Sequence, residues 1–356
     1  MSKILIIANL FGNNRQGYDL ASALRGQGHV VRLVQYASSS QPAIGNYGVG
    51  FVCPHGLFSK FHVLRNMFSI ALRSFPFRCD IIVCIGSSLL PVALFLKMIN
   101  GADLAYYALE YCAYGNINQL ILRRYVTKYI DVEEHRRTRV FKDLNISMPF
   151  FIIYNMPPLT DKKYDKGGLR CYLKKNFGLS GDEKIVLYAG SYQSYSCLGN
   201  IIEASLYAKA NVVYVLMVAW GLPDDFTVKS SHCYLVPPQQ GDEFFNWVSE
   251  ADGMLLPYES SNDFNVLNCS PQKLFDCYLL GVPYLASKRP LIEAVHSVYE
   301  QAGCFCDFTK VESIVSGVIS LVEMKSEAVS HRMMKMYRTR YNYSAYADKL
   351  AQFLQE

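Results

Sequence analysis

The same order of elements, strand, loop, helix and strand, opens two separate parts of the chain. In the first part, residues 3–8 are an apolar run of strand length, and residues 10–17 form a Gly/Asn-rich loop. Residues 18–25 repeat apolar side chains at helical spacing, and residues 29–34 form a second apolar strand. Because parallel strands need a crossover connection such as a helix, this pattern predicts a parallel sheet covered by helices.

The second copy of the pattern begins at residue 184. Residues 184–189 fit a strand, residues 199–208 a helix and residues 211–220 the next strand. The segment before this copy, residues 159–181, is charged and contains several glycines, so we expect a loop and a domain boundary there.

The predicted fold class is therefore α/β, with two Rossmann-like domains facing a cleft. At ~100–200 residues per domain, a chain of 356 residues fits this division. We place the first domain at residues 1–158 and the second at residues 159–339. The C-terminal helix, residues 340–356, is expected to pack back on the first domain.

Charge is divided unevenly between the two parts of the chain. Residues 1–150 hold 16 Lys/Arg and 8 Asp/Glu, a net charge of +8, whereas the remaining residues have a net charge of −3. An account of function must therefore explain the basic first part. The 51% hydrophobic and 18% charged residues exclude collagen, coiled coils and wholesale disorder.

No segment has the pattern of a signal peptide or a membrane span. The first apolar run is too short for a signal core, and the longest apolar stretch, residues 81–96, is interrupted by Gly86 and Pro91. The 11 cysteines are scattered without a CxxC pair, as is usual for reduced thiols. We therefore expect a cytoplasmic protein.

Gly12 and Arg15 lie in the loop between the first predicted strand and the first predicted helix. A helix N-terminus at the carboxyl end of a strand offers backbone N–H groups and a positive dipole to an anion. The loop lacks the GxGxxG spacing of a dinucleotide site. We expect it to bind a phosphate or the acceptor; the alternative is that its glycines only shape a tight turn.

A second turn of this kind follows the strand at residues 184–189. Gly190 permits a close backbone approach, and the N–H groups at and after Ser191 are placed to hold a phosphate. Most α/β proteins have such a turn, so this signal is weak by itself.

The most informative motif is the run Asn268-Cys269-Ser270-Pro271-Gln272-Lys273-Leu274-Phe275-Asp276. Ser270 suits an N-cap and Pro271 the first helical position, which predicts a helix start. Lys273 in the first turn opposes the helix dipole unless an anion lies nearby, and Asp276 follows one turn later. A lysine for a diphosphate and a carboxylate for sugar hydroxyls suit a nucleotide-sugar site. The alternative is an ordinary Lys–Asp pair on a surface helix.

This run, continued by Gly281-Val282-Pro283-Tyr284-Leu285-Ala286, resembles the Ser-Pro-x-Lys-Leu-Phe-Glu … Gly-x-Pro-Val-Ile-Ala segment of bacterial GT-B glycosyltransferases. The resemblance is to the broad family 4 group of retaining enzymes, of the surface polysaccharide type. It is specific for the superfamily and unspecific for donor and acceptor. Further matching segments are residues 3–8, 28–31, 131–136, 154–157, 190 and 251–257.

The resemblance implies a donor site in the second domain. Asp276, in place of the family's Glu, would bind the ribose, and Lys273 would hold the diphosphate with the Gly190 turn. Two features depart from the family: Asn268 stands near the position of the first acid, and residues 192–198 contain no Lys or Arg. The expected donor-binding residues are Gly190, Ser191, Val236, Pro237, Asn268, Ser270, Pro271, Lys273 and Asp276, with Val236 and Pro237 at the base.

Glu110 follows a predicted strand, at the end expected to face the cleft. It could orient the acceptor hydroxyl or act as a general base, so we take Glu110 and Lys273 as the catalytic candidates. The alternative is a loop carboxylate paired with Arg123, Arg124 or Arg136.

Residues 57–78 form a basic amphipathic segment with no acid. Such segments are typical of helices that lie in a membrane interface, where anionic lipids attract Lys and Arg. The alternative is a core helix with a solvated face. The sequence contains no recognisable nucleic-acid-binding module. The expected membrane-facing residues are Lys60, Phe61, Arg65, Phe68 and Arg73.

We therefore predict a glycosyltransferase of the hexosyltransferase type, retaining and metal-independent, that needs no cofactor. The donor would be a UDP- or GDP-linked sugar, and the acceptor a lipid-linked glycan in O-antigen or capsule biosynthesis. The protein would lie at the inner face of the cell membrane and bind no nucleic acid. Two alternatives stay open: a nucleotide-sugar 2-epimerase, and a non-catalytic glycosyltransferase-like partner subunit.

Overall fold

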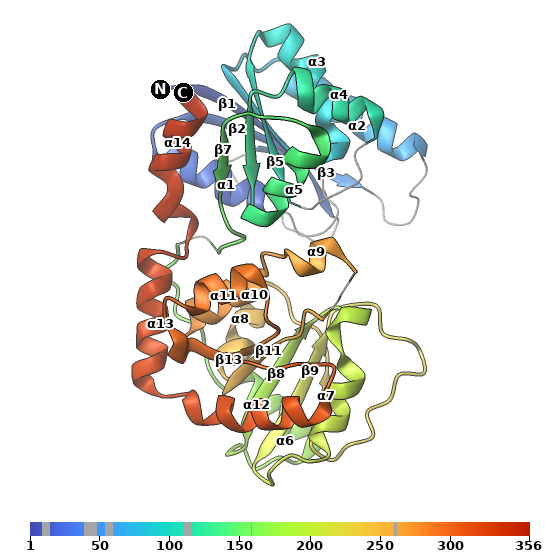
Figure 1. Cartoon of the computed structure of the whole chain (residues 1–356), viewed down its shortest axis with the longest axis vertical. Helices are drawn as coiled ribbons and strands as arrows, with labels where there is room; N and C mark the ends of the chain where they lie inside the picture. The colour runs from blue at the N-terminus through green and yellow to red at the C-terminus, as the bar shows by residue number, and fades with distance from the viewer. Residues whose placement is uncertain (9–14, 39–47, 54–59, 110–114, 158, 260–261) are drawn as a thin grey trace. The chain divides into compact units, whose positions relative to one another are not determined.

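The computed structural model divides the chain into two compact units, each built on one parallel sheet (Figure 1). Unit 1 comprises Met1–Pro158 and Tyr343–Glu356, and unit 2 comprises Leu159–Asn342. The chain returns to unit 1 at Tyr343, slightly later than the residue 340 expected. The structure describes residues 1–8, 15–38, 48–53, 60–109, 115–157, 159–259 and 262–356, with side chains for all of these except 15, 36–38, 48–53 and 60–66.

Unit 1 has a sheet of seven strands in the order β3-β2-β1-β4-β5-β6-β7, all paired in parallel. The chain reverses its direction of travel across the sheet between β1 and β4, which is the arrangement of a doubly wound fold. The strands are β1 (Lys3–Ala8), β2 (Val30–Ser38), β3 (Gly48–Cys53), β4 (Ile81–Ile85), β5 (Asp103–Ala108), β6 (Lys128–Asp131) and β7 (Phe150–Ile152).

The central strands of unit 1 are continuous apolar runs because helices cover both faces of a parallel sheet. Every residue from Ile4 to Ala8 in β1 and from Ile81 to Ile85 in β4 is buried. The helices of this unit are α1 (Arg15–Gly26), α2 (Lys60–Ser74), α3 (Leu90–Asn100), α4 (Asn116–Arg124), α5 (Glu134–Leu144) and α14 (Ala347–Gln355).

The C-terminal segment is fixed to unit 1 by buried polar contacts. The hydroxyl oxygens of Tyr107 in β5 and Tyr343 lie 2.7 Å apart, and the Lys128 ammonium donates to the carbonyl of Leu354 at 2.8 Å. Gln355 also reaches the hydroxyl of Ser2, so the two ends of the chain lie side by side (Figure 1). Residues 343–356 therefore complete the core of unit 1.

Unit 2 has a sheet of six parallel strands in the order β10-β9-β8-β11-β12-β13. Its reversal lies between β8 and β11, so the carboxyl ends of these two strands form the crevice where doubly wound folds bind ligands. The strands are β8 (Lys184–Gly190), β9 (Val212–Val218), β10 (Cys233–Val236), β11 (Gly253–Leu256), β12 (Tyr284–Ala286) and β13 (Gly303–Phe305).

Two helices of unit 2 differ from the sequence prediction. The segment expected to be a loop contains α6, whose Leu169 and Leu173 are buried one turn apart. In α10 the N-cap is Pro271 and not Ser270, so the helix begins one residue later than predicted. The helices are α6 (Gly168–Phe177), α7 (Leu198–Ser205), α8 (Gly241–Ser249), α9 (Phe264–Leu267), α10 (Gln272–Leu280), α11 (Pro290–His296), α12 (Val311–Met324) and α13 (Glu327–Thr339).

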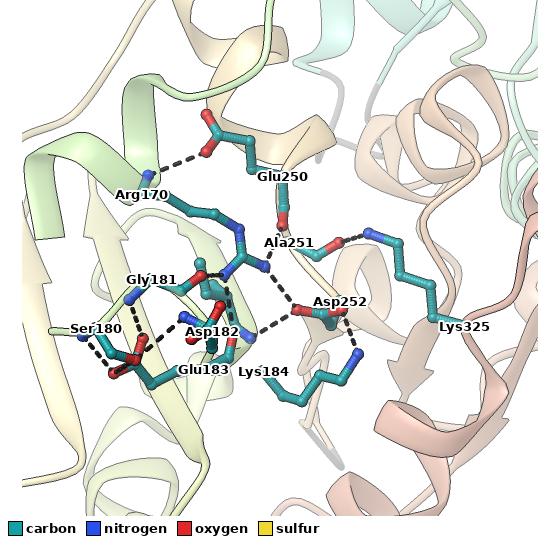
Figure 2. A network of polar contacts seen from close by, with 11 residues as sticks. Arg170, Ser180, Gly181, Asp182, Glu183, Lys184, Glu250, Ala251, Asp252 and Lys325 are labelled. Carbon is teal, nitrogen blue, oxygen red and sulfur yellow. Dashed lines mark hydrogen bonds and ion pairs between the residues drawn. The ribbon is translucent and has the colours of Figure 1, made fainter. Parts of the chain in front are cut away.

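A polar network holds the amino-terminal edge of the unit 2 sheet, opposite the crevice (Figure 2). Asp252, just before β11, accepts from Arg170 at 3.1 Å and from Lys184 at 3.2 Å. The Glu250 carboxylate accepts from the backbone N–H of Arg170 at 3.0 Å, and Lys325 donates to the carbonyl of Ala251. The network ties α6 and the end of α12 to the starts of β8 and β11, which is a structural role.

Within the described residues, no helix has both the length and the apolar character needed to cross a membrane.

Candidate functional site

The sequence-predicted residues Gly190, Ser191 and Lys273 line one cavity of unit 2. Gly190 ends β8, the β11 side contributes residues 255–258, and Lys273 projects from the first turn of α10. The cavity therefore lies at the carboxyl ends of the two strands where the sheet reverses. The cavity is small, about 30 Å³, well below the roughly 300–1,000 Å³ of typical ligand sites, so it is one part of a larger site.

Lys273 carries a charge that the surrounding protein does not fully stabilise. Burial lowers the pKa of its ammonium, while the nearby Asp276 carboxylate acts in the opposite direction. Its position in the first turn of α10 also sets it against the positive end of the helix dipole. An anion in the cavity would stabilise both the ammonium and the helix N-terminus, because opposite charge favours the charged form.

The turn after β8 has little room for a side chain. The Tyr188 hydroxyl donates to the carbonyl of Ser191 at 2.6 Å, and the carbonyl of Gly190 accepts from the N–H of Ala219 at 2.7 Å. A Cβ atom on Gly190 would lie 2.6 Å from the Tyr188 hydroxyl oxygen. Glycine is therefore required to keep this turn closed against the tyrosine.

Two tyrosines form a wall of the cavity. The rings of Tyr195 and Tyr258 are stacked, with centroids 6.0 Å apart and planes 12° apart. Burial raises the pKa of Tyr258 and of Tyr188, so both hydroxyls stay protonated at neutral pH, and the hydrogen of Tyr188 is already donated to the carbonyl of Ser191. The cavity is thus lined by the ammonium of Lys273 and the neutral side chain of Tyr258.

A larger hollow of about 500 Å³ opens next to this cavity, at the carboxyl ends of β12 and β13. Its volume is within the range of small-molecule sites. Arg289 links the two, because its guanidinium pairs with Glu259 at 3.2 Å and donates to the carbonyl of Tyr258. Sequence reasoning missed this hollow, although two cations directly after a predicted strand were a usable signal. It is lined by Glu259, Lys288, Arg289, Phe305, Cys306, Asp307 and Thr309.

The other predicted donor residues lie outside the lining of the Lys273 cavity. Asp276 is 3% exposed on the buried side of α10, and Asn268 follows α9, where its amide donates to the carbonyl of Phe264. Ser270 is buried before α10. Val236 and Pro237 stand at the end of β10, on the same edge of the sheet but two strands from β8.

The candidates of unit 1 are only partly within the described structure. Gly12 and Glu110 lie outside the described residues, and Arg15 begins α1 with its side chain outside the description. Arg136, one of the three arginines considered as a partner for Glu110, is 3% exposed and pairs with the buried Asp131. It also donates to the carbonyls of residues 108 and 109 at the end of β5.

The predicted membrane segment contains α2, which spans Lys60–Ser74 and is shorter than the 57–78 expected. Phe68 is 65% exposed and Arg73 is also exposed, which fits both a membrane-facing helix and a core helix with a solvated face. The side chains of Lys60, Phe61 and Arg65 lie outside the description. For the part of the chain that is described, no three His, Cys, Asp or Glu side chains gather in a way that could hold a metal ion.

No protein-family model and no curated protein sequence matches the chain. Solved structures do match over its whole length. Sucrose-phosphate synthase from Thermosynechococcus elongatus aligns with a TM-score of 0.71 at 10% identity, covering 100% of this chain and 98% of that one. Anabaena HepE in complex with UDP-glucose (TM-score 0.68, 12% identity) and the lipopolysaccharide outer core galactosyltransferase WaaB (0.63, 10%) each align over 100% of both chains. With two Rossmann-like units and these neighbours, the chain has the fold of the GT-B glycosyltransferases.

Proposed function

We propose that the chain transfers a sugar from a UDP- or GDP-linked donor to an acceptor hydroxyl, and that unit 2 binds the donor. The observation that carries this proposal is the convergence of Lys273 and the Gly190–Ser191 turn on one cavity at the reversal of the sheet. A diphosphate there would meet backbone N–H groups, a helix N-terminus and an ammonium. Anabaena HepE, which shares the fold, was solved with UDP-glucose.

In this proposal the main catalytic task of the site is to stabilise the leaving group. In a retaining transfer of a hexosyl group, negative charge develops on the departing nucleoside diphosphate. Fixed positive groups at that position act more strongly in a water-excluded site than in solution. Lys273 would supply the charge directly, because residues 192–198 contain no Lys or Arg to share it. We expect this reaction to proceed without an added metal ion or cofactor.

The remaining donor contacts are assigned by the resemblance. Asp276, which is 3% exposed in α10, would bind the ribose in place of the family's Glu. Val236 and Pro237 would border the base, and Asn268 would meet the sugar in place of an acid. Ser270 and Pro271 would place the N-terminus of α10 beneath the diphosphate.

The acceptor is assigned to unit 1. Gly12 and Arg15, at the loop before α1, would hold an acceptor phosphate, and Glu110 would orient or deprotonate the acceptor hydroxyl. The basic character of residues 1–150 supports an anionic acceptor. We propose a lipid-linked glycan of surface polysaccharide biosynthesis, such as O-antigen or capsule, handled at the inner face of the cell membrane. WaaB, which shares the fold, is a lipopolysaccharide outer core galactosyltransferase.

The direct test is release of nucleoside diphosphate from a panel of UDP- and GDP-sugars, with and without a bacterial lipid extract. The proposal expects release from one donor that increases with the extract, is unchanged by EDTA, and is lost in Lys273→Ala. Lys335→Ala, an exposed lysine of α13, is the matched control. Interconversion of the donor sugar without an acceptor would instead identify a 2-epimerase.

A second candidate function rests on two departures from the family pattern. Asn268 stands near the place of a family acid, and residues 192–198 contain no Lys or Arg, as a non-catalytic partner subunit would permit. The absence of turnover with every donor, together with an unchanged cellular glycan after Lys273→Ala, would favour this alternative over an enzyme.

A further inference from the structure

Three neighbouring helices of unit 1 present large apolar side chains to solvent. The helices α2, α3 and α4 follow one another in contact on one side of the sheet (Figure 1). Phe68 on α2, Met98 on α3 and Ile117 on α4 are 65%, 72% and 68% exposed. We name this surface the three-helix face. Its exposed apolar residues are Phe68, Leu72, Phe75, Phe95, Met98, Ile117 and Leu120.

The middle helix shows most clearly that this face is not an ordinary solvated surface. In α3, Leu90, Val92, Ala93 and Leu96 pack into the core, and Lys97 is its single charged residue. A soluble surface helix places polar residues opposite its core face, but α3 places Phe95 and Met98 there. A helix that is apolar nearly all round is normally covered on both sides. The outer side of α3 therefore needs a partner.

The charge on the three helices has one sign. Their sequences contain no Asp or Glu, and they carry six Lys or Arg. Arg73 ends α2 beside Leu72, and Arg123 and Arg124 end α4. Exposed apolar side chains on helices whose charged residues are all cations fit a surface that is apolar within and anionic at its rim. The six cations are Lys60, Arg65, Arg73, Lys97, Arg123 and Arg124.

We propose that the three-helix face docks on a bilayer that contains anionic lipids, with the apolar side chains inserted between headgroups and the cations paired with phosphates. The sequence predicts only residues 57–78; the structure adds α3 and α4, so exposed apolar side chains lie on three neighbouring helices in place of one. This inference deepens the membrane part of the proposed function. It does not need sugar transfer to be true, because docking requires neither donor nor acceptor.

The test is co-sedimentation of the full chain with vesicles of pure phosphatidylglycerol or pure phosphatidylcholine, in the absence of any nucleotide sugar. We expect binding to phosphatidylglycerol, weaker binding to phosphatidylcholine, and a decrease with salt as the Debye length falls from about 10 Å at 0.1 M to about 3 Å at 1 M. The absence of binding to phosphatidylglycerol at low salt would overturn the proposal.

Matched variants distinguish binding through the three-helix face from nonspecific adsorption to vesicles. Phe68→Ser/Met98→Ser/Ile117→Ser should reduce vesicle binding at least tenfold, whereas Leu206→Ser/Tyr207→Ser, on equally exposed residues of unit 2, should leave it unchanged. Arg73→Gln/Arg124→Gln should weaken binding to phosphatidylglycerol only, with Lys174→Gln/Lys175→Gln as the control on α6.

Two further outcomes would contradict docking on lipid. Equal loss of binding in the unit 2 control would show nonspecific adsorption. Self-association of the wild-type chain that disappears in the Phe68/Met98/Ile117 variant, with no vesicle binding, would show that a second copy of the protein covers the face. Because the vesicle assay contains no donor, its failure would leave the sugar-transfer proposal to be judged by nucleotide release alone.

Discussion

Lys273 and Gly190 line the same cavity although 83 positions separate them in the chain. Gly190 ends β8, and Lys273 lies in the first turn of α10, which follows β11, the strand paired with β8. The reversal of the sheet between β8 and β11 is what brings the two residues together. A cation and a closed glycine turn thus meet where the topology of unit 2 leaves a crevice.

Replacing Lys273 with methionine should stabilise the protein at neutral pH while weakening donor binding. Burial lowers the pKa of Lys273 below its ordinary value of 10.5, so the unfolded state binds this proton more tightly. The lysine therefore costs stability at neutral pH, and that cost shrinks as the pH rises toward 10.5. Thermal unfolding should give Lys273→Met a midpoint higher by about 2 °C or more at pH 7, with a smaller difference at pH 10. A lower midpoint at pH 7 would show that the ammonium is well stabilised without a ligand.

The Gly190 turn should not tolerate alanine. The added Cβ would press on the Tyr188 hydroxyl and break its hydrogen bond to the carbonyl of Ser191. We expect Gly190→Ala to weaken binding of the donor at least tenfold, about 1.4 kcal/mol, measured by calorimetric titration with the nucleoside diphosphate. Gly199→Ala is the control: a Cβ there meets nothing within 4 Å in α7, and alanine should add about 0.5–1 kcal/mol of stability. If both variants bind the nucleoside diphosphate equally well, the Gly190 turn is not part of the donor site.

The Asp131–Arg136 pair should be essential to the stability of unit 1. Asp131 is fully buried and Arg136 is 3% exposed, so Asp131→Ala leaves a buried cation without its carboxylate. The expected cost is about 3–5 kcal/mol in the free energy of unfolding by urea. Asp143→Ala breaks the exposed pair with Arg139 and should cost less than about 1 kcal/mol. A loss of similar size in both variants would contradict the assigned role of burial.

Strands that are apolar runs could be predicted from the sequence, whereas burial alone was not enough, because β6 is fully buried and was not predicted. β1, β4 and β9 are uninterrupted apolar runs, and their periodicity has one interpretation. The strand β6 was not predicted because it begins at Lys128 and ends at Asp131, and charged residues are rarely buried. Here Lys128 is buried against the carbonyl of Leu354, and Asp131 against Arg136. Such contacts come from distant segments, and no local pattern encodes them.

The residues of the Lys273 cavity could be predicted from sequence motifs, but the cavity and the hollow beside it could not. The Lys273 motif and the Gly190 turn were each visible, and their grouping came from a family resemblance. The hollow beside them was missed because Glu259, Arg289 and Asp307 follow three different strands and converge only in the folded sheet. The helix α6 was not predicted because glycines stand at both of its ends and glycine is typical of loops. In the structure, Gly167 and Gly178 cap the helix in left-handed conformations.

The most direct test of the central claim is calorimetric titration of the chain with UDP and with GDP. The account predicts that wild type and Lys335→Ala bind one of these with equal affinity, and that Lys273→Ala binds it at least about tenfold more weakly, about 1.4 kcal/mol. Undiminished binding by Lys273→Ala, or no binding of either nucleotide by the wild type, would contradict the assignment of this cavity to the donor diphosphate.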